Sequence, residues 1–355
     1  MKSIDLTAVE HLLQGHVDVR RRPGSIQPLR YPAAEHEFYD PFTRFVASTP
    51  AGVRLRLRTD SDVLQLKVRQ RTLANPDGSP RPAAWRVYVN GDVRGNATVT
   101  GGALMLADGT IKGDDRATVI ANLPRSDNEV QLWFPQGSTV SIEEVALADG
   151  AHWAPWSDHR KRILFHGSSI THCLEANGGD GSWPAVAANL ADLHLINLGW
   201  AGSCLLSGLA ARIIRDQKAD AIVLKLGINV HGEAQLKERT FLDSAHAMLS
   251  IIREKHAATP IAVISPIWSP PREDASPQGG PTLIRMRELL QTVVAARQKS
   301  GDDRIRYLSG LELFGSADRA DLPDELHPNH AGYARMGERF HKLMLTGENA
   351  LVRAK

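Results

Sequence analysis

The chain of 355 residues contains only two cysteines and no long apolar run. Cys173 and Cys204 are too few for a disulfide framework, and no spacing of cysteine and histidine resembles a structural zinc site. No stretch approaches the roughly 20 consecutive apolar residues that a membrane helix needs. The N-terminus places acidic and polar side chains where a secretory signal needs an apolar run. A cytoplasmic location is therefore the default expectation, unless a signal was removed.

The chain also has no large excess of charge of either sign. It contains 42 Lys and Arg and 40 Asp and Glu, which gives a formal net charge of +2. The one tight basic run, residues 20–22, is typical of a solvated turn rather than of a nucleic-acid surface. Hydrophobic residues make up 42% and charged residues 23%, the balance of an ordinary globular protein. We expect no nucleic acid and no membrane among the partners, and the oligomeric state stays open.

Residues 1–150 have the pattern of an all-β domain. Apolar and charged residues alternate along residues 53–57, which is the period-2 signature of a strand with one buried face. Turn sequences such as Asn90-Gly91 separate further runs of this kind at residues 63–68, 85–89, 117–120, 130–134 and 140–145. This spacing predicts a β-sandwich of about eight strands, with an irregular N-terminal segment up to residue 51.

Residues 160–350 change period. Apolar runs end at Gly, Ser or Pro, and helix-like stretches follow most of them, for example residues 183–193 and 233–255. Strand then helix, repeated about five times, predicts a parallel sheet covered on both faces. Ligands bind outside the carboxyl ends of the strands in such sheets, so chemistry is expected there. Residues 152–162 are expected to link the two domains.

Short polar motifs follow the strand ends of this second domain. They are Phe-His-Gly-Ser-Ser at residues 165–169, Gly-Trp-Ala-Gly at 199–202, Gly-Ile-Asn at 227–229 and Asp-Glu-Leu-His at 324–327. Taken singly, a serine between strand and helix is typical of a helix N-cap, and a glycine of a turn. A lone histidine is most often a surface residue or a satisfied interior one.

Together these motifs supply the parts of an acyl-transfer site. A serine hydroxyl needs a base within hydrogen-bond reach, and the base needs a group that orients it. We expect His327 to take the proton of Ser169, and Asp324 to accept the Nδ1 proton of the imidazole. Their spacing of three residues puts both side chains on one side of a helical turn. The backbone amides of Ser169 and Gly202 and the side-chain NH₂ of Asn229 are the candidate oxyanion donors.

This order of motifs resembles the SGNH (GDSL) hydrolase family over about residues 160–345. In that family a nucleophile serine, an oxyanion glycine, an oxyanion asparagine and an Asp-x-x-His pair follow one another. The whole chain resembles the bacterial subgroup in which an N-terminal β-sandwich, jelly-roll-like, precedes the hydrolase domain. The resemblance implies a flavodoxin-like three-layer α/β/α domain. The Gly-x-Ser-x-Gly motif of ordinary α/β-hydrolases does not occur in the chain.

The sequence departs from the family at one place, since the usual Gly-Asp-Ser reads Gly167-Ser168-Ser169. The catalytic triad does not use that aspartate, so the departure bears on local geometry and rate rather than on identity. Either Gly199 or Gly202 can be the oxyanion donor. We favour Gly202, because the family donor tends to sit later in the turn.

Other residues near these motifs are candidates for the pocket. Trp200, His231 and Trp268 are the ones we single out. Trp268 begins a loop rich in Pro and Gly that extends to Pro281, and this loop is either a lid or pocket wall or an inert surface loop.

Neighbouring histidines and thiols have structural alternatives. His166, His172 and His231 lack a helix-spaced pair or an acidic partner, so structural or pocket-lining roles are favoured over metal ligation. Cys173 and Cys204 follow two of the motifs and are expected as buried free thiols, with a disulfide as the alternative.

The chain is thus expected to be a carboxylic ester hydrolase that acts on small acyl groups through an acyl-enzyme, without cofactor or metal. A carbohydrate O-acetyl ester is the candidate substrate, because β-sandwiches appended to esterases often contact glycans. A short-chain lipase, a thioesterase and an acyltransferase would need the same triad. An inert glycan-binding protein is the alternative of another class, which the presence of all the motif residues disfavours.

Overall fold

The computed structural model describes residues 1–233 and 235–353, which form two compact units. The first unit comprises Met1–His159 together with Leu174–Gly181. The second unit comprises Arg160–Cys173 and Ser182–Lys355. None of the helices in the described part of the chain is both long and apolar enough to cross a membrane.

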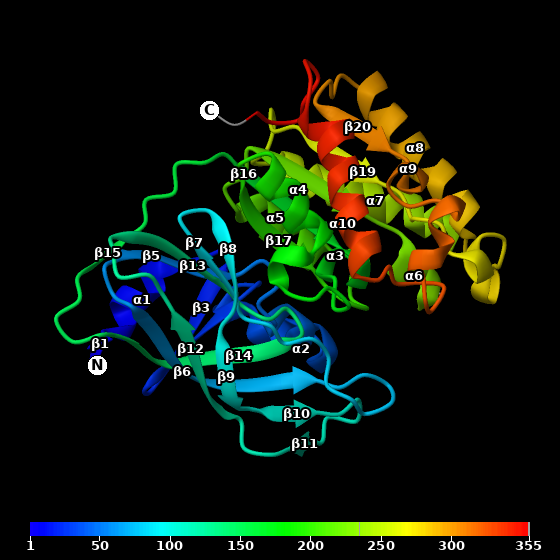
Figure 1. Cartoon of the computed structure of the whole chain (residues 1–355). Coiled ribbons are helices and arrows are strands. Elements are labelled where there is room, and N and C mark those ends of the chain that lie inside the picture. The colour runs from blue at the N-terminus through cyan, green and yellow to red at the C-terminus, as the bar shows by residue number, and fades with distance from the viewer. Residues whose placement is uncertain (234, 354–355) are drawn as a thin grey trace. The chain divides into compact units, whose positions relative to one another are not determined.

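Two antiparallel-rich sheets build the first unit (Figure 1). The main path of the nine-stranded sheet runs β11-β10-β6-β14-β4-β3, and the six-stranded sheet runs β15-β5-β13-β7-β8, joined by β2. The strands of the larger sheet are β1 (Lys2–Ile4), β3 (Asp18–Arg22), β4 (Ser25–Leu29), β6 (Val63–Leu73), β9 (Thr98–Gly101), β10 (Ala103–Met105), β11 (Ile111–Lys112), β12 (Arg116–Asn122) and β14 (Ser138–Leu147). Those of the smaller sheet are β2 (Leu13–Gln14), β5 (Arg54–Thr59), β7 (Arg86–Val89), β8 (Asp92–Asn96), β13 (Asn128–Trp133) and β15 (Trp153–Pro155).

Alternation along the strands creates the core of this unit. In β6, Leu66 and Val68 are buried while Lys67 and Arg69 are exposed, as a period-2 pattern requires. Leu66 and Val68 from the larger sheet share one hydrophobic cluster with Leu55 and other residues of the smaller sheet. The predicted sandwich is confirmed, with more strands than the sequence indicated.

The first 51 residues are more regular than the sequence indicated. They supply four strands together with α1 (Leu6–Leu12), η1 (Ala33–Phe38) and α2 (Pro41–Ser48). Both α-helices begin at aspartate caps, because Asp5 accepts from Thr7 N and Asp40 from Phe42 N and Thr43 N. Residues 20–22 form the end of β3 rather than the predicted solvated turn, because β3 pairs with β4 through a tight hairpin.

Leu174–Gly181 is held in the first unit by polar contacts within that unit. Gln136 Nε2 donates to the carbonyl oxygen of Ala176 at 2.8 Å. Tyr88 Oη donates to Asp180 Oδ2 at 2.7 Å, and Arg86 Nε reaches the same oxygen at 3.2 Å. These contacts join residues far apart in the sequence, and no local pattern predicted them.

The second unit contains a five-stranded parallel sheet in the order β17-β16-β18-β19-β20. These strands are β16 (Arg162–Gly167), β17 (His194–Gly199), β18 (Ala221–Lys225), β19 (Ile261–Ile264) and β20 (Ile305–Leu308). Numbered within the sheet, the order is 2-1-3-4-5, which is the flavodoxin-like order. The predicted α/β class and sheet type are therefore confirmed.

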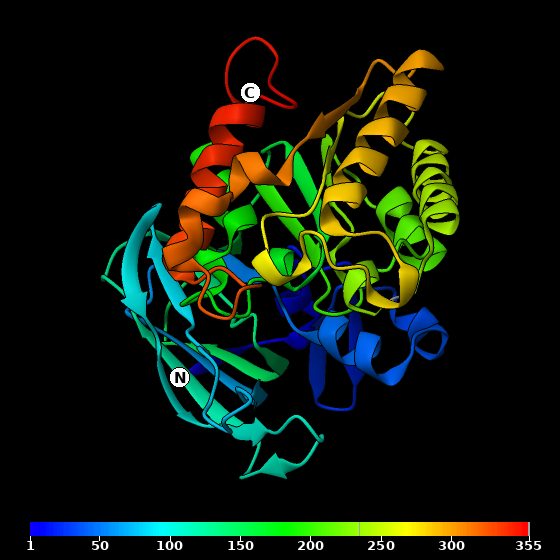
Figure 2. The same cartoon turned by 90° about the vertical axis from the view of Figure 1, so that its right-hand side faces the viewer.

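Helices cover both faces of this sheet (Figures 1 and 2). The pair α4 (Trp183–Leu190) and α10 (His330–Phe340) packs together on one face, and α5 (Gly208–Asp216), α7 (Glu238–Arg253) and α8 (Leu283–Lys299) pack in series on the other. The ring of Phe165 on β16 lies edge-on to Trp183 and Phe340, with centroid distances of 5.0 and 5.5 Å. This cluster fixes β16 beneath the first helix pair.

Short elements complete the second unit at the ends of the strands. They are α3 (Ser169–His172), α6 (Ile228–Gly232), η3 (Pro270–Arg272), η4 (Pro277–Gly279), α9 (Gly310–Leu313), η5 (Ser316–Asp321) and the π-helical turn His341–Leu345. The short helix η2 (Gly179–Gly181) belongs to the first unit. The helix predicted over residues 233–255 begins only at Glu238, and residue 234 lies outside the described residues. The predicted link 152–162 supplies β15, which pairs with β5.

Lys225 ends the central strand β18 and is almost completely buried, with 1% exposure. Its Nζ atom has no hydrogen-bond partner among the described residues. Burial lowers the pKa of Lys225 from 10.5 to about 8, against a smaller opposing influence of Cys204 and Cys173. A buried ammonium group without a partner destabilises the folded state.

Replacing this side chain by an apolar one of similar length should therefore stabilise the protein. The lowering from 10.5 to about 8 corresponds to about 3 kcal/mol at neutral pH. Between pH 8 and pH 10.5 the unfolded state binds the Lys225 proton and the folded state does not, so this destabilisation fades as pH rises. Lys225→Met should unfold at higher urea than the wild type at pH 7, and the gap should shrink at pH 10.

The matched control is Lys299→Met, at the exposed end of α8. That variant should leave the midpoint unchanged at both pH values. Equal or lower stability of Lys225→Met at pH 7 would contradict the account of the buried ammonium group.

Candidate active site

In the turn between β16 and α3, the helix cap and the candidate nucleophile are two different serines. Ser168 is the N-cap of α3, and its Oγ accepts from the backbone amide of Ile170 at 3.3 Å. Ser169, the first residue of the helix, therefore has a hydroxyl that the cap does not use. The residue at the position of the family aspartate thus caps the helix.

Ser169, His327 and Asp324 form a continuous chain of hydrogen bonds. Ser169 Oγ lies 2.8 Å from His327 Nε2, and His327 Nδ1 lies 2.6 Å from Asp324 Oδ2. An ionised carboxylate only accepts hydrogen bonds, so Nδ1 carries the proton and Nε2 is the acceptor that faces the serine hydroxyl. This is the arrangement in which a histidine can withdraw the serine proton.

The segment from Asp324 to His327 is a turn and not the helical turn that the spacing suggested. Asp324 Oδ1 accepts from the backbone amides of Leu326 at 3.0 Å and His327 at 2.6 Å. Glu325 has a φ of +59°, which ends any helical continuation. Asp324 therefore holds its own turn with one oxygen and the imidazole with the other.

Ionisation of Asp324 is favoured despite its partial burial. Burial alone would raise its pKa. The side-chain and backbone hydrogen bonds from His327, the charge of that residue and the Leu326 amide outweigh this effect and hold the pKa of Asp324 well below its usual value. The carboxylate stays charged throughout the neutral range and can stabilise a protonated imidazole.

Ser269, a buried serine in the loop after β19, supports the Asp324–His327 turn through a hydrogen bond. Ser269 Oγ donates to the carbonyl oxygen of Glu325 at 2.6 Å, and Arg272 Nη1 donates to Ser269 Oγ at 3.0 Å. Glu273 accepts from the Ser269 amide at 3.0 Å and forms an ion pair with Arg287 at 2.6 Å. Sequence reasoning missed these residues, because Ser269 and Glu325 lie 56 positions apart and share no motif.

The two candidate oxyanion glycines differ in what their amides do. The Gly199 amide donates to Asn197 Oδ1 at 2.8 Å, and a Cβ there would lie 2.3 Å from the His172 nitrogen. Gly199 is thus a close-packing glycine whose amide is occupied. Gly202 adopts a φ of +71° in the following turn, and no acceptor for its amide occurs among the described residues. The geometry favours Gly202.

Asn229 is oriented by the same loop. Its Oδ1 accepts from the Cys204 backbone amide at 3.1 Å. The side-chain NH₂ therefore occupies the opposite end of the amide and is available as a donor. Asn197 links β17 to α3, because its side-chain Nδ2 donates to the carbonyl oxygen of Thr171 at 3.0 Å. Sequence reasoning missed Asn197.

The three candidate pocket residues have different surroundings. Trp200 is 1% exposed, and its ring lies edge-on to His166 at 5.6 Å, so it belongs to the interior of the unit. His231 Nε2 contacts the carbonyl oxygen of Ala275 at 3.1 Å, and burial lowers its pKa. Trp268 is partly exposed with the Arg319 guanidinium 6.0 Å from its ring centre. A pocket role for these residues stays a prediction.

Cys173 and Cys204 are both buried, and they form no disulfide bond among the residues that the structure describes. Burial raises the pKa of Cys204 to about 12, against an opposing influence of Lys225. His166 is anchored by Leu198, whose carbonyl oxygen lies 2.9 Å from Nδ1. No group of three His, Cys, Asp or Glu side chains placed to hold a metal ion occurs within residues 1–233 and 235–353.

Comparison with known proteins places the second unit in a family. Residues 165–335 match the model of the GDSL-like Lipase/Acylhydrolase family. A search of curated proteins found no match.

Solved structures share the fold over nearly the whole chain. The salicylyl-acyltransferase SsfX3 from a tetracycline biosynthetic pathway is 28% identical, with 93% of this chain and 92% of that chain covered and a TM-score of 0.83. A Bacteroides ovatus protein described as a GDSL-like lipase is 19% identical, with coverages of 96% and 95% and a TM-score of 0.73. A family two carbohydrate esterase from Cellvibrio japonicus is 14% identical, with coverages of 96% and 96% and a TM-score of 0.62. The last two show the fold alone.

Loss of the Ser269 hydroxyl should loosen the turn that carries Asp324 and His327. Ser269→Ala removes the buried donor to the Glu325 carbonyl, a change worth about 1–3 kcal/mol. We expect kcat for p-nitrophenyl acetate to fall about tenfold with KM unchanged, because positioning and not substrate binding is affected. Steady-state kinetics measure this split.

Ser265→Ala is the matched control. Ser265 is equally buried and accepts from Tyr307 Oη at 2.9 Å and from the Gly310 amide at 3.1 Å. It should lose stability while keeping kcat. An equal fall of kcat in both variants would mean that Ser269 acts only through general stability.

Proposed function

Because residues 165–335 belong to the GDSL-like lipase/acylhydrolase family, we propose that this chain hydrolyses carboxylic esters of small acyl groups with Ser169 as nucleophile. The observation that carries the proposal is the hydrogen-bonded chain from Ser169 Oγ through His327 to Asp324. It supplies a nucleophile, a base and a charge that orients the base, all from side chains.

The first half of the reaction forms an acyl-enzyme. His327 Nε2 takes the hydroxyl proton as Ser169 Oγ attacks the ester carbonyl carbon, and the Nδ1 proton stays hydrogen-bonded to Asp324. The oxyanion that forms accepts from the amides of Ser169 and Gly202 and from the NH₂ group of Asn229. His327 then gives its proton to the departing alcohol, and the acyl group remains on Ser169.

The second half removes the acyl group. A water molecule takes the place of the alcohol, His327 Nε2 accepts one of its protons, and the resulting hydroxide attacks the acyl carbon. The tetrahedral species collapses, Ser169 Oγ regains a proton from His327, and the carboxylic acid leaves. The ionised Asp324 stabilises the imidazolium in both halves.

An O-acetylated carbohydrate is the substrate class we propose. The support is the likeness in fold to a family two carbohydrate esterase, and the β-sandwich that precedes the hydrolase domain. An acetyl group is small, so a site that binds it needs no long acyl channel. A small-molecule or carbohydrate ester is accordingly the partner that we propose.

Acyl transfer is the second candidate. The observation that favours it is the similarity to the salicylyl-acyltransferase SsfX3, 28% identical over 93% of this chain. The acyl-enzyme would be the same, and the outcome would depend on whether water or a hydroxylated acceptor attacks it. Hydrolysis and transfer thus differ only in the second half.

Removal of the nucleophile should abolish ester hydrolysis. Ser169→Ala should lower kcat for p-nitrophenyl acetate by at least about 10³-fold, and Asn229→Ala by about 10²–10³-fold through loss of one oxyanion donor. Ser207→Ala is the control. It removes the N-cap of α5, which should cost about 1 kcal/mol of stability and leave kcat unchanged. Wild type and Ser169→Ala with the same rate would sink the proposal.

The acyl and alcohol parts of the substrate can then be separated. We expect p-nitrophenyl esters to be cleaved more slowly as the acyl chain lengthens, and acetylated xylo-oligosaccharides to release acetate. Fast cleavage of long chains indicates a lipase, preference for acyl thioesters a thioesterase, and ester formation with an added alcohol an acyltransferase. A folded wild type without any of these activities would support the inert glycan-binding alternative.

A further inference from the structure

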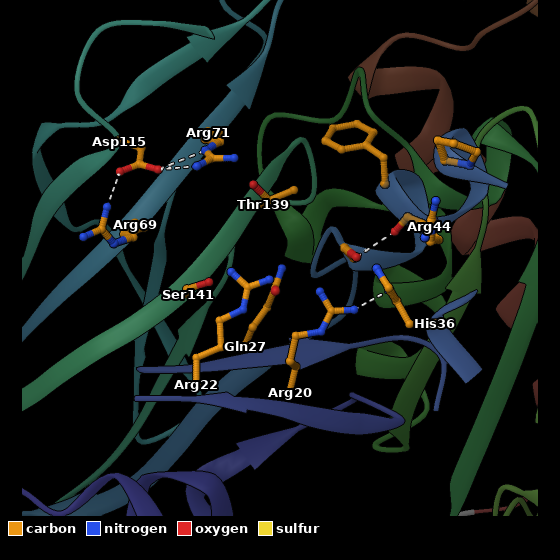
Figure 3. A pocket seen from close by; sticks show the side chains of 13 residues that line it. Arg20, Arg22, Gln27, His36, Arg44, Arg69, Arg71, Asp115, Thr139 and Ser141 are labelled. Atoms are coloured by element: carbon orange, nitrogen blue, oxygen red, sulfur yellow. Dashed lines mark hydrogen bonds and ion pairs between the residues drawn. The ribbon is translucent and has the colours of Figure 1, made fainter. Parts of the chain in front are cut away.

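A cationic cavity of about 330 Å³ lies on the outer face of the nine-stranded sheet (Figure 3). Its floor comes from β6, β14, β4 and β3, and its wall from η1 and α2. Arg71 faces Thr139, and Arg69 faces Ser141, in the register of β6 and β14. Arg20 faces Gln27 in the β3–β4 pair. Because side chains alternate between the two faces along a strand, these side chains lie on the same face of the sheet.

Five arginines line this cavity, and their counter-charges are incomplete. Asp115, the one carboxylate among the described residues that line the cavity, binds Arg71 at 2.7 Å and Arg69 at 3.0 Å. Arg44 pairs with the exposed Glu37 at 3.0 Å. Arg69 also forms an ion pair at 2.7 Å with Glu143, which lies outside the cavity.

Arg20 and Arg22 have no carboxylate partner among the described residues. Arg20 donates only to neutral groups, namely Tyr31 Oη at 3.0 Å and His36 Nδ1. Arg22 makes no side-chain hydrogen bond or ion pair within the described part of the chain. Both side chains point from β3 into the cavity (Figure 3). Because they are two positions apart on one strand face, their positive charges are placed close together without compensation.

His36 responds to this local charge. Burial lowers its pKa, and the charges of Arg20, Arg44 and Arg22 lower it further against the opposing Glu37. Its Nδ1 atom accepts from Arg20, since a guanidinium group has no acceptor. The imidazole is therefore neutral and adds a polar wall rather than a sixth positive charge.

The remaining lining suits a hydroxylated ligand rather than a bare ion. Thr139, Ser141 and Ser48 contribute hydroxyl groups and Gln27 contributes an amide, while Phe45 contributes an apolar ring. The volume lies at the lower end of the range for small-molecule sites. Guanidinium groups bind carboxylate and phosphate oxygens through paired donors.

We propose that this cavity binds a small hydroxylated oxyanion, such as a sugar that carries a phosphate or a carboxylate group. Arg20 and Arg22 supply the uncompensated donors for the oxyanion, and the hydroxyl and amide groups of the sheet face hydrogen-bond the rest of the ligand. The site is independent of Ser169 and of the proposed esterase activity.

Isothermal titration calorimetry of the full chain tests the proposal with glucose 6-phosphate and glucuronate as the two anionic arms. We expect at least one of them to bind, and binding to weaken as ionic strength rises. Glucose should not bind, and inorganic phosphate should bind more weakly than the better arm. The arm that binds identifies the oxyanion as phosphate or carboxylate. If neither binds, or if inorganic phosphate binds equally well, the proposal is overturned.

Two neighbouring variants locate the site. Arg22→Gln should weaken binding about tenfold, which equals about 1.4 kcal/mol. Arg21→Gln is the matched control, because Arg21 leaves the same strand, pairs with Glu10 outside the cavity and should bind like wild type. Equal affinities of the two variants would place the ligand elsewhere. Ser169→Ala should keep wild-type binding, so failure of the esterase proposal and failure of this one are distinguishable.

Discussion

The hydrogen bond between Ser169 Oγ and His327 Nε2 joins residues that are 158 positions apart. Neither residue can set this distance alone, so the rest of the second unit has to set it. The parallel sheet fixes the serine, since β16 lies between β17 and β18 and only Ser168 separates its end from α3. The histidine is fixed by a turn that Asp324 closes with its own side chain. The candidate site is therefore a property of the whole sheet and its connections.

The same distance is maintained by contacts that do not touch the reacting atoms. Asn197 links the ends of β17 and α3, and Ser269 holds the backbone between Asp324 and His327. Trp183 adds a third support, since its Nε1 donates to the carbonyl oxygen of Ile170 at 2.9 Å. Such buried bonds restrict the side chains to the geometry that an acyl transfer requires, before any substrate arrives.

Local periodicity predicted the sandwich and the parallel sheet, because alternation and buried apolar runs are properties of single strands. The strand-end rule then brought Ser169, Gly202 and Asn229 to one edge. The sequence could not indicate the residues that support the site, because Ser269 and Glu325 come into contact only in the folded chain. It predicted a turn at residues 20–22, since a basic run indicates solvent exposure but does not show that these residues pair in a β-hairpin. The shape of the Asp324 turn also depended on a positive φ at Glu325, which no spacing rule predicts.

The central claim is that Ser169 carries the acyl group during turnover. Mixing the protein briefly with p-nitrophenyl acetate, quenching in acid and mapping peptides by mass spectrometry tests it most directly. The account predicts one added acetyl group, located on Ser169, which disappears on further incubation at neutral pH as water completes the reaction. An unmodified Ser169 peptide during active turnover, or a transient acetyl group on another residue, would contradict it.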